Sequence, residues 1–425
     1  MVLLVTVVFI LGYFAIILEH PLRINKAASA LITGVLCWTI YAMMAPGGEL
    51  AGHALGASLG ELAGILFFLL GAMTIVELVD AHDGFEIITR RIRSTNKRKL
   101  VWTIGFISFF LSAVLDNLTT TIVMVSMLRA IIPDRKERML FAGLVIIAAN
   151  AGGAWSPIGD VTTTMLWIGG QITAGSIILK TFIPSLVCFA LPAWIISLRM
   201  KGAVTPPQEA AVAFTNTRFE RNTVFWVGAG SLLFVPVFKA VTHLPPYMGV
   251  LLGLGLMWVV TEIIHSGKDE AEKGIYSVNH ALRKIDTPSI LFFLGILLSI
   301  AALQVTGVLG DLAVSLNKSV GNISLITMLI GFLSAVVDNV PLVAAAQGMY
   351  SLDQYPTGHY FWEFLAYCAG TGGSCLVIGS AAGVAAMGLE KLEFFWYLRI
   401  IGWLALLGYL AGALVFMGQH LLLPG

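Results

Sequence analysis

The chain has 425 residues, of which 58% are hydrophobic and only 12% are charged, and its mean hydropathy is +0.89. Soluble globular proteins average about 25% charged residues, so this composition excludes an ordinary soluble domain and indicates a protein surrounded by membrane lipids. The net charge of +1 gives no electrostatic basis for a nucleic-acid partner.

Apolar runs long enough to cross a bilayer recur along the whole chain, which predicts an all-α polytopic membrane protein. The predicted spans are 2–18, 28–45, 60–80, 139–165 and 176–198, followed by 222–240, 246–265, 288–303, 360–387 and 394–418. Two further apolar runs, 100–128 and 322–349, exceed the ~20 residues of one crossing and fall short of two. We predict that each forms a re-entrant hairpin, which enters and leaves by the same face.

The basic residues favour this arrangement. If the N-terminus lies outside and both odd runs are hairpins, the inner segments hold 22 of the 25 Lys and Arg residues. Those segments are 19–27, 82–99, 129–138, 199–221, 266–287 and 388–399. The positive-inside rule predicts this bias, because cytoplasmic loops are rich in Lys and Arg.

Two motifs occur once in each half of the chain. SAVLDN at 112–117 returns as SAVVDN at 334–339, and NAGGAWSPIGD at 150–160 has a counterpart in GTGGSCLVIGS at 370–380. The halves, 1–205 and 206–425, each hold five predicted spans and one hairpin, and an odd number of spans inverts the second half. Inverted repeats are typical of secondary transporters, whose substrates bind near the bilayer midplane. A helix-packing motif is the alternative, but such motifs favour small residues over Asp.

Glycine and proline interrupt the spans 139–165 and 360–387, so we predict a broken helix in each. The two breaks and the two hairpin turns would bring unwound backbone and polar side chains to one midplane cavity. The polar candidates are Asp116, Asn117, Thr119, Thr120, Asn150, Ser156, Asp160 and Thr162 in the first half, and Asp338, Asn339, Thr371, Ser374 and Ser380 in the second. Their carboxylate, amide and hydroxyl oxygens suit hard cations. We therefore expect an alkali or alkaline-earth cation to bind at Asp116, Asn117, Asn150, Asp160, Asp338 and Asn339.

Asp116, Asp160 and Asp338 have no Lys or Arg close to them in the sequence. Charged carboxylates are costly in an apolar site, and neighbouring like charges add to the cost. At least one of the three should therefore hold a proton until a metal ion displaces it, which is the chemistry of a cation/proton exchanger. Alternatively, the three residues are structural and cap half-helices.

Other acidic residues lie closer to the predicted membrane faces. Glu61 and Asp286 open equivalent spans in the two halves, which predicts either gate or vestibule carboxylates or ordinary helix caps. His82 and the acidic residues beside it lie near the predicted inner face, where they form either a solvated helix end or a pH sensor. The chain contains no HExxH motif and no intramembrane His with a metal-ligand spacing, so we expect neither an enzyme nor a cofactor. The four cysteines form no CxxC pattern and are expected to pack as small apolar residues.

The paired SAVLDN and SAVVDN segments, with NAGGAWSPIGDVTTTM between them, resemble the NhaD-type sodium/proton antiporters. That family belongs to the ion transporter superfamily, with arsenite permeases and dicarboxylate transporters. The resemblance implies exchange of Na⁺ or Li⁺ for H⁺ across a bacterial cytoplasmic membrane, in the service of pH homeostasis. It also implies a homodimer, in which a transport part moves against a scaffold. The family's polar positions fall on Asp116, Asn117, Asn150, Asp160, Thr162, Asp338 and Asn339. The N-terminal part is shorter than the family pattern, by one span.

The main alternative is an anion carrier of the same superfamily, either a sodium-coupled dicarboxylate symporter or an arsenite-type permease. Three carboxylates at one depth would repel an anion unless cations neutralised them first, which disfavours the symporter. A permease for a neutral or weakly charged oxyacid is harder to separate from an antiporter. Intramembrane acids also disfavour a purely structural membrane subunit.

Overall fold

The computed structural model describes residues 1–44, 48–89, 92, 94–204 and 217–422. Within these ranges the secondary structure is helical, apart from one isolated bridge between Asn96 and Ala203. Several helices begin at a side chain that satisfies free N–H groups of the first turn, as Asp134 does for the Glu137 N–H. Thr217 and Glu220 form a reciprocal capping box at the start of another helix.

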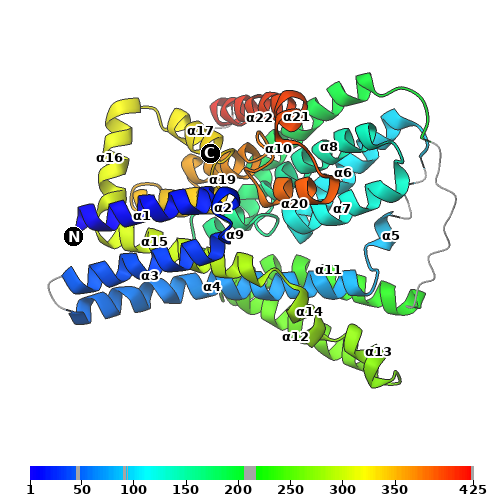
Figure 1. The fold of residues 1–425 in the computed structure, drawn as a ribbon, viewed down its shortest axis with the longest axis horizontal. Coiled ribbons are helices and arrows are strands. Elements are labelled where there is room, and N and C mark those ends of the chain that lie inside the picture. Colours follow the sequence, from blue (N-terminus) through cyan, green and yellow to red (C-terminus); the bar gives the residue numbers. More distant parts are fainter. Residues whose placement is uncertain (45–47, 90–91, 93, 205–216, 423–425) are drawn as a thin grey trace.

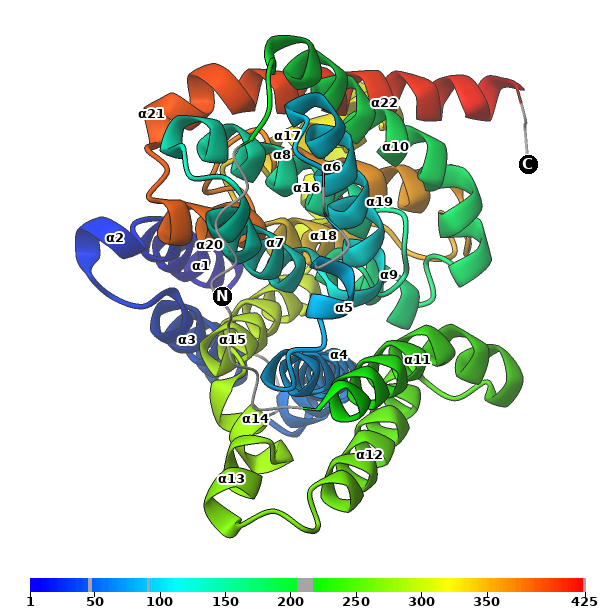
Figure 2. The same cartoon turned by 90° about the vertical axis from the view of Figure 1, so that its right-hand side faces the viewer.

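The helices form two groups, which the end-on view separates (Figure 2). The first group comprises α1 (Val2–Ile17), α3 (Lys26–Met44), α4 (Gly48–Ala81), α11 (Arg218–Thr242), α12 (Pro246–Ile264) and α15 (Thr287–Val305). The contacts of the first half are repeated in the second. Helix α1 packs on α3, and α11 packs on α12 in the same way. Helix α3 packs on α15, and α12 packs on α4 in the same way. Both halves of the chain therefore contribute equally to this group.

The second group contains the interrupted helices (Figure 1). In the first half these are α6 (Lys97–Leu115), α7 (Asn117–Ile131), α8 (Arg135–Gly153), α9 (Val161–Ile168) and the continuous helix α10 (Ala174–Arg199). Their counterparts are α17 (Ile323–Leu333), α18 (Asn339–Met349), α19 (Tyr360–Gly372), α20 (Ala381–Glu390) and α22 (Trp403–Leu422), the last preceded by α21 (Phe394–Tyr397) and a π-helical turn at 398–402. The pairing of α6 with α8 is repeated by α17 with α19. The inversion of one half relative to the other stays a prediction.

Short helices occupy several connections that the sequence analysis left without structure. They are α2 (Glu19–Leu22), α5 (Glu86–Thr89), α13 (Glu270–Ile275), α14 (Val278–Lys284) and α16 (Val308–Val320). Helix α16 meets α17 at a bend of 116°. Its apolar residues follow one face only, so it lacks the continuous apolar run by which spans were predicted.

Eight helices in the described ranges are long and apolar enough to cross a membrane, or nine if α16 and α17 count as one bent span. This finding confirms a polytopic helical protein but does not reproduce all ten predicted crossings. The predicted span 60–80 was too short, because α4 already begins at Gly48. The predicted hairpin 100–128 corresponds to α6 and α7, which break at Asp116, and its re-entrant path stays a prediction.

Two repeat-related glycines bring the broken helices against the hairpins. A Cβ atom at Gly152 of α8 would lie 2.1 Å from the Phe109 carbonyl oxygen of α6. A Cβ atom at Gly372 of α19 would lie 1.9 Å from the Gly331 carbonyl oxygen of α17. Only glycine permits backbone contact this close, so each broken helix seats directly on its hairpin.

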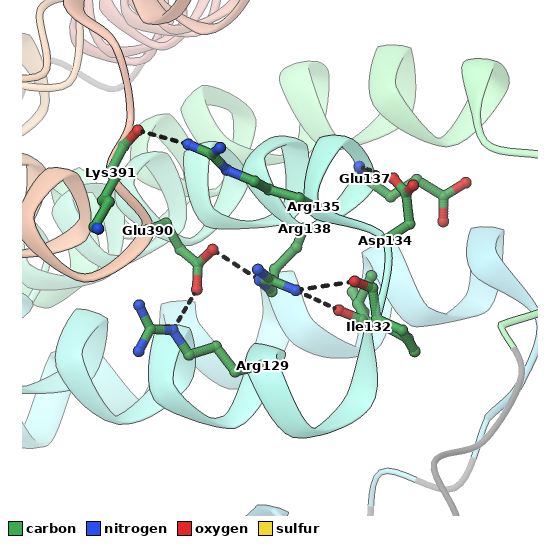
Figure 3. Close-up of polar contacts among 9 residues, drawn as sticks. Arg129, Ile132, Asp134, Arg135, Glu137, Arg138, Glu390 and Lys391 are labelled. Carbon is green, nitrogen blue, oxygen red and sulfur yellow. Dashed lines mark hydrogen bonds and ion pairs between the residues drawn. The ribbon is translucent and has the colours of Figure 1, made fainter.

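A buried carboxylate joins the two halves at the far ends of α7, α8 and α20. Glu390 is 1% exposed at its side chain, and its two oxygens accept from Arg129 Nε and Arg138 Nε, each at 2.7 Å (Figure 3). Arg138 also donates to the Ile132 carbonyl at 2.9 Å, while Arg135 reaches the Lys391 carbonyl. We call Glu390, Arg129 and Arg138 the arginine clamp.

Candidate ion site

Each of the four helix breaks ends at a side chain that caps the following half-helix. The capping residues are Asp116, Asp160, Asp338 and Ser380, which accept a backbone N–H at 2.7, 3.0, 3.2 and 3.1 Å respectively. The structural alternative of the sequence analysis therefore describes part of their role. Capping is not their whole role, because the side chains of Asp116, Asp160 and Ser380 also accept hydrogen bonds from other side chains.

Asp160 lies where the two halves meet, and it is only 2% exposed. Its Oδ2 accepts from Asn117 Nδ2 at 3.0 Å in the first half and from Asn339 Nδ2 at 3.3 Å in the second. Its Oδ1 accepts from the Thr162 hydroxyl at 3.0 Å. Amides and hydroxyls thus surround the carboxylate, and no ion pair with Lys or Arg reaches it within the described ranges.

Asn150 extends this network into the second broken helix. Its Oδ1 accepts from Asn117 at 3.1 Å, while its Nδ2 donates to the hydroxyls of Ser374 and Ser380, each at 2.9 Å. Asn150 is fully buried. A buried amide with partners at both ends fixes the relative position of the two breaks, because losing a partner would leave a polar group unsatisfied.

Asp116 occupies a strained turn that its repeat counterpart does not share. Its backbone φ is +108° and ψ is +163°, whereas Asp338 has φ −50° and ψ +136°. A non-glycine residue with such a φ costs about 1–3 kcal/mol and persists only where its surroundings enforce it. Here the Thr119 backbone and hydroxyl both donate to the Asp116 carboxylate, at 2.7 and 2.9 Å. The first hairpin tip is therefore built to hold this carboxylate in place.

Asp338 has a basic partner, which corrects the expectation that all three carboxylates lack one. Lys26 Nζ at the start of α3 lies 3.5 Å from Asp338 Oδ2. The two residues are 312 positions apart, so sequence proximity could not reveal the pair. Asp116 and Asp160 have no such pair within the described part of the chain.

Two predicted ligands use their hydroxyls on the backbone instead. Ser156 donates to the Ala113 carbonyl at 2.5 Å, and Thr371 donates to the Tyr367 carbonyl at 2.6 Å. Thr120 and its neighbour Thr121 are buried, and their hydroxyl oxygens have no hydrogen-bond partner in the described structure. An unsatisfied buried hydroxyl is uncommon, so Thr120 keeps oxygen capacity for a ligand.

A cavity of about 140 Å³ lies between the first hairpin and residues 284–286, which belong to the predicted inner segment 266–287. It is lined by Met73, Val76, Glu77, Asp80, Leu118, Thr119, Ile122, Val123, Lys284, Ile285 and Asp286. Thr119 also donates to Asp116, so the cavity adjoins the first hairpin tip. We call this cavity the inner vestibule.

The two predicted gate carboxylates have different positions. Asp286 lines the inner vestibule and also caps α15, accepting the Ser289 N–H at 3.2 Å. Glu61 does not open a span, because α4 begins 13 residues earlier, and its side chain is exposed and outside the vestibule lining. Glu61 therefore does not open its helix as Asp286 does, because the first-half helix is longer at its start.

His82 lies in a histidine pair beyond the ends of α4 and α12. Its Nε2 is 2.8 Å from Nε2 of His265, and both rings are buried and stack near Tyr276. His82 Nδ1 lies 2.7 Å from the Leu78 carbonyl, so it must donate there, and His265 must then donate to His82. Burial lowers the pKa of His82 and, with Lys268 and His82 nearby, lowers the pKa of His265 to about 4. Burial therefore favours the neutral form of both rings.

Comparison with known proteins places the chain among membrane transporters. The family described as citrate transporter matches residues 5–363. Sodium/proton antiporter 1 of Arabidopsis thaliana is 50% identical over 97% of this chain and 71% of its own length. Sodium/proton antiporter 2 of the same plant is 47% identical over 97% and 98%. The Na⁺/H⁺ antiporter NhaD of Vibrio cholerae is 31% identical over 98% of this chain and 90% of its own.

The chain belongs to the NhaD-type sodium/proton antiporter family. As a family member it is a multi-pass membrane protein of a transporter family, in agreement with the sequence analysis. The expected bacterial cytoplasmic membrane is not supported, because relatives at 50% and 47% identity come from a plant. The homodimer stays a prediction from the family resemblance.

Proposed function

We propose that this chain exchanges Na⁺ or Li⁺ for H⁺ across a membrane by alternating access, with cation and proton competing for Asp116, Asp160 and Asp338. The observation that supports this best is the buried Asp160 carboxylate, which receives amide groups from both halves and has no basic partner in the described structure. A proton or a small cation can neutralise such a carboxylate, and each displaces the other.

The surrounding amides can serve both states of this site. Asn117 and Asn339 now donate their N–H groups to Asp160. A half-turn of an amide group exchanges its nitrogen for its oxygen, which would then face an entering cation. Carboxylate, amide and hydroxyl oxygens together form the ligand type that hard cations prefer.

The arrangement is unfavourable for the alternative anion carrier. An anionic substrate would use free N–H groups at half-helix N-termini. Three of the four N-termini here are already capped by carboxylates, at Asp116, Asp160 and Asp338. An anion entering this site would meet those negative charges before it reached the backbone.

Alternating access is proposed from the two helix groups. Asp160, Asp116 and both hairpin tips belong to the second group, whereas Lys26 belongs to the first. The inner vestibule reaches Thr119 from one side. We propose that movement of the second group against the first opens the site to the opposite side, and that the first group forms the contact of a homodimer.

The test is proton movement in proteoliposomes that contain the purified full chain and an internal pH-sensitive dye. NaCl, LiCl, KCl, succinate and arsenite are added separately, with protein-free liposomes as the control. We expect a pH change driven by Na⁺ or Li⁺ and none by KCl or succinate. Uptake of labelled succinate or arsenite without any cation response would replace the antiporter with an anion carrier.

A further inference from the structure

A lysine from the first helix group reaches into the candidate ion site of the second. Lys26 Nζ lies 3.5 Å from Asp338 Oδ2 and 4.4 Å from the centre of the Phe292 ring. The side chains of Lys26 and Asp338 are 33% and 23% exposed, so the pair is partly shielded from water. The Lys26 backbone is held as well, because its N–H donates to Glu19 Oε1 at 3.1 Å.

The direction of this side chain is unusual for its position. A lysine near the end of a membrane helix normally extends towards the headgroups, where water solvates its charge. Lys26 points instead to a hairpin tip and lies over an aromatic face, which stabilises a cation by its negative quadrupole. The charge of Asp338 also acts on the Tyr13 hydroxyl and on the Asp160 carboxylate. Lys26 is thus the cation that the fold supplies to this acidic cluster.

We propose that Lys26 is an internal counter-cation that occupies Asp338 when no Na⁺ is bound, and that it thereby sets the apparent affinity for Na⁺. This inference rests on the proposed antiport function. A Na⁺ ion that uses Asp338 as a ligand must first separate the Lys26–Asp338 pair. The ammonium and the metal ion therefore compete for one carboxylate, and the ion pair raises the Na⁺ concentration needed for half-maximal transport.

The pair also joins the two helix groups. Lys26 lies on α3, and Asp338 lies at the tip between α17 and α18. Breaking the pair on Na⁺ binding removes a contact across the boundary at which movement is proposed. Lys26 is therefore a positioning residue, which acts on the ion through Asp338.

The experiment compares Lys26→Gln and Lys26→Arg with the wild type in the proteoliposome assay, over a range of NaCl concentrations. Lys26→Gln removes the competing charge, so the KM for Na⁺ is expected to fall on the order of three- to tenfold, as for a partly shielded ion pair. Lys26→Arg retains the charge and should keep a KM close to the wild-type value. Lys318→Gln, an exposed lysine on α16, serves as the matched control and should leave the KM unchanged.

A binding measurement covers the case in which a variant no longer transports. The NaCl concentration that gives half-maximal thermal stabilisation of the detergent-purified protein, against choline chloride, should fall in parallel with the KM. In an Asp338→Asn background, Lys26→Gln should have no further effect on either value. An unchanged or raised KM in Lys26→Gln, with normal wild-type exchange, would show a static brace and overturn the inference alone. Absence of any Na⁺ response in the wild type would overturn the proposed function and the inference together.

Discussion

Asp160 receives hydrogen bonds from side chains of both halves. A substitution that removes only its charge therefore tests whether that charge is needed for transport. Asp160→Asn keeps the size of the side chain but replaces an acceptor-only group with one that also donates. Two amides that now donate to Asp160 would meet a third N–H group. We expect Na⁺-driven proton movement to fall at least tenfold, because the charge that attracts both ions is lost. The measurement is the dye assay in proteoliposomes.

Asn322→Asp provides a control for expression and reconstitution, since Asn322 caps α17 on the exposed surface and Asp caps as well as Asn does. This control should transport like the wild type. Full exchange by Asp160→Asn would mean that Asp160 is only a helix cap.

The buried histidine pair predicts a pH dependence of stability. The pKa of His265 is lowered to about 4 in the folded protein from its ordinary value near 6.5. Between these values the unfolded chain binds the proton more strongly, so stability is complete above pH 6.5 and falls as the pH drops towards 4. The charged groups that act on the pair are Lys268, Glu220, Glu262 and Asp83.

We therefore expect the melting temperature of the detergent-purified protein to decrease from pH 7.5 to pH 5. His265→Asn should reduce this decrease, whereas His53→Asn, at an exposed position of α4, should preserve it. Identical pH profiles for His265→Asn and the wild type would remove the histidine pair as the cause.

At the level of single residues, the Asp-Asn pair that occurs in both halves predicted several members of the polar network. Asn117, Asn339 and Asp160 are in contact, as one shared cavity predicts. The Lys26 partner of Asp338 and the backbone bonds of Ser156 could not be predicted, because they depend on how distant elements pack. The buried histidine pair was also missed, since His265 lies in a connection 183 positions after His82.

At the scale of elements, the arginine clamp joins α7, α8 and α20 through the buried charge of Glu390. The Arg138 side chain is 17% exposed and that of Arg129 is 52% exposed, while Glu390 is almost fully buried. Removing the shielded partner leaves a buried carboxylate poorly compensated, at a cost of roughly 3–5 kcal/mol. An exposed partner contributes roughly 0–1 kcal/mol. Arg138→Met should therefore lower the melting temperature clearly more than Arg129→Met.

Differential scanning fluorimetry of both variants in the same detergent makes this comparison. Glu390→Gln in each background tests the cause, since neutralising the carboxylate should remove most of the difference between the two arginine variants. Equal losses for Arg129→Met and Arg138→Met would contradict a role for burial in the clamp.

Elements were predicted well where an apolar run or a glycine break marked them, as in α8 and α9. The spans failed at their ends, because α4 begins before its apolar segment, in GELAGHALGASLGEL, where Gly, Glu and His lower the hydropathy although the chain is helical. Amphipathic α16 was missed for the related reason that half of its residues are polar. Hydropathy detects burial in lipid, whereas helix formation requires only hydrogen bonding and packing.

At the scale of the whole molecule, the distribution of basic residues and the position of the inner vestibule predict that ions reach the site from the inner side of the membrane. The natural cysteines Cys37, Cys188, Cys368 and Cys375 are all buried, so the wild type offers a quiet background for thiol labelling. A Met73→Cys variant places a thiol in the vestibule lining. We expect a membrane-impermeant maleimide to modify it from the side that bears the 82–99 connection, and NaCl to slow the reaction.

Lys99→Cys and Lys318→Cys mark the predicted inner and outer sides, and both positions are exposed. Labelling is compared in right-side-out and inside-out vesicles. Modification of Met73→Cys together with Lys318→Cys, and not with Lys99→Cys, would reverse the assigned direction of the vestibule.

The fold class could be anticipated because long apolar runs recur along the whole chain. The path of the hairpins could not, since a run of intermediate length fits both a full crossing and a return to the same face. Helix α6 has 19 residues, which is enough for a crossing by itself.

The reach of Asn150 to Ser374 and Ser380 also has a consequence for biosynthesis. A ribosome completes Asn150 more than 200 residues before these serines, so the amide enters the membrane without the hydroxyls that it later contacts. Until the second half is inserted, the Asn150 side-chain nitrogen lacks both of these acceptors, and only its oxygen has a partner within the first half, Asn117. This amide nitrogen would mark a chain whose second half is not yet in place, and the mark would be lost once the break between α19 and α20 packs against Asn150.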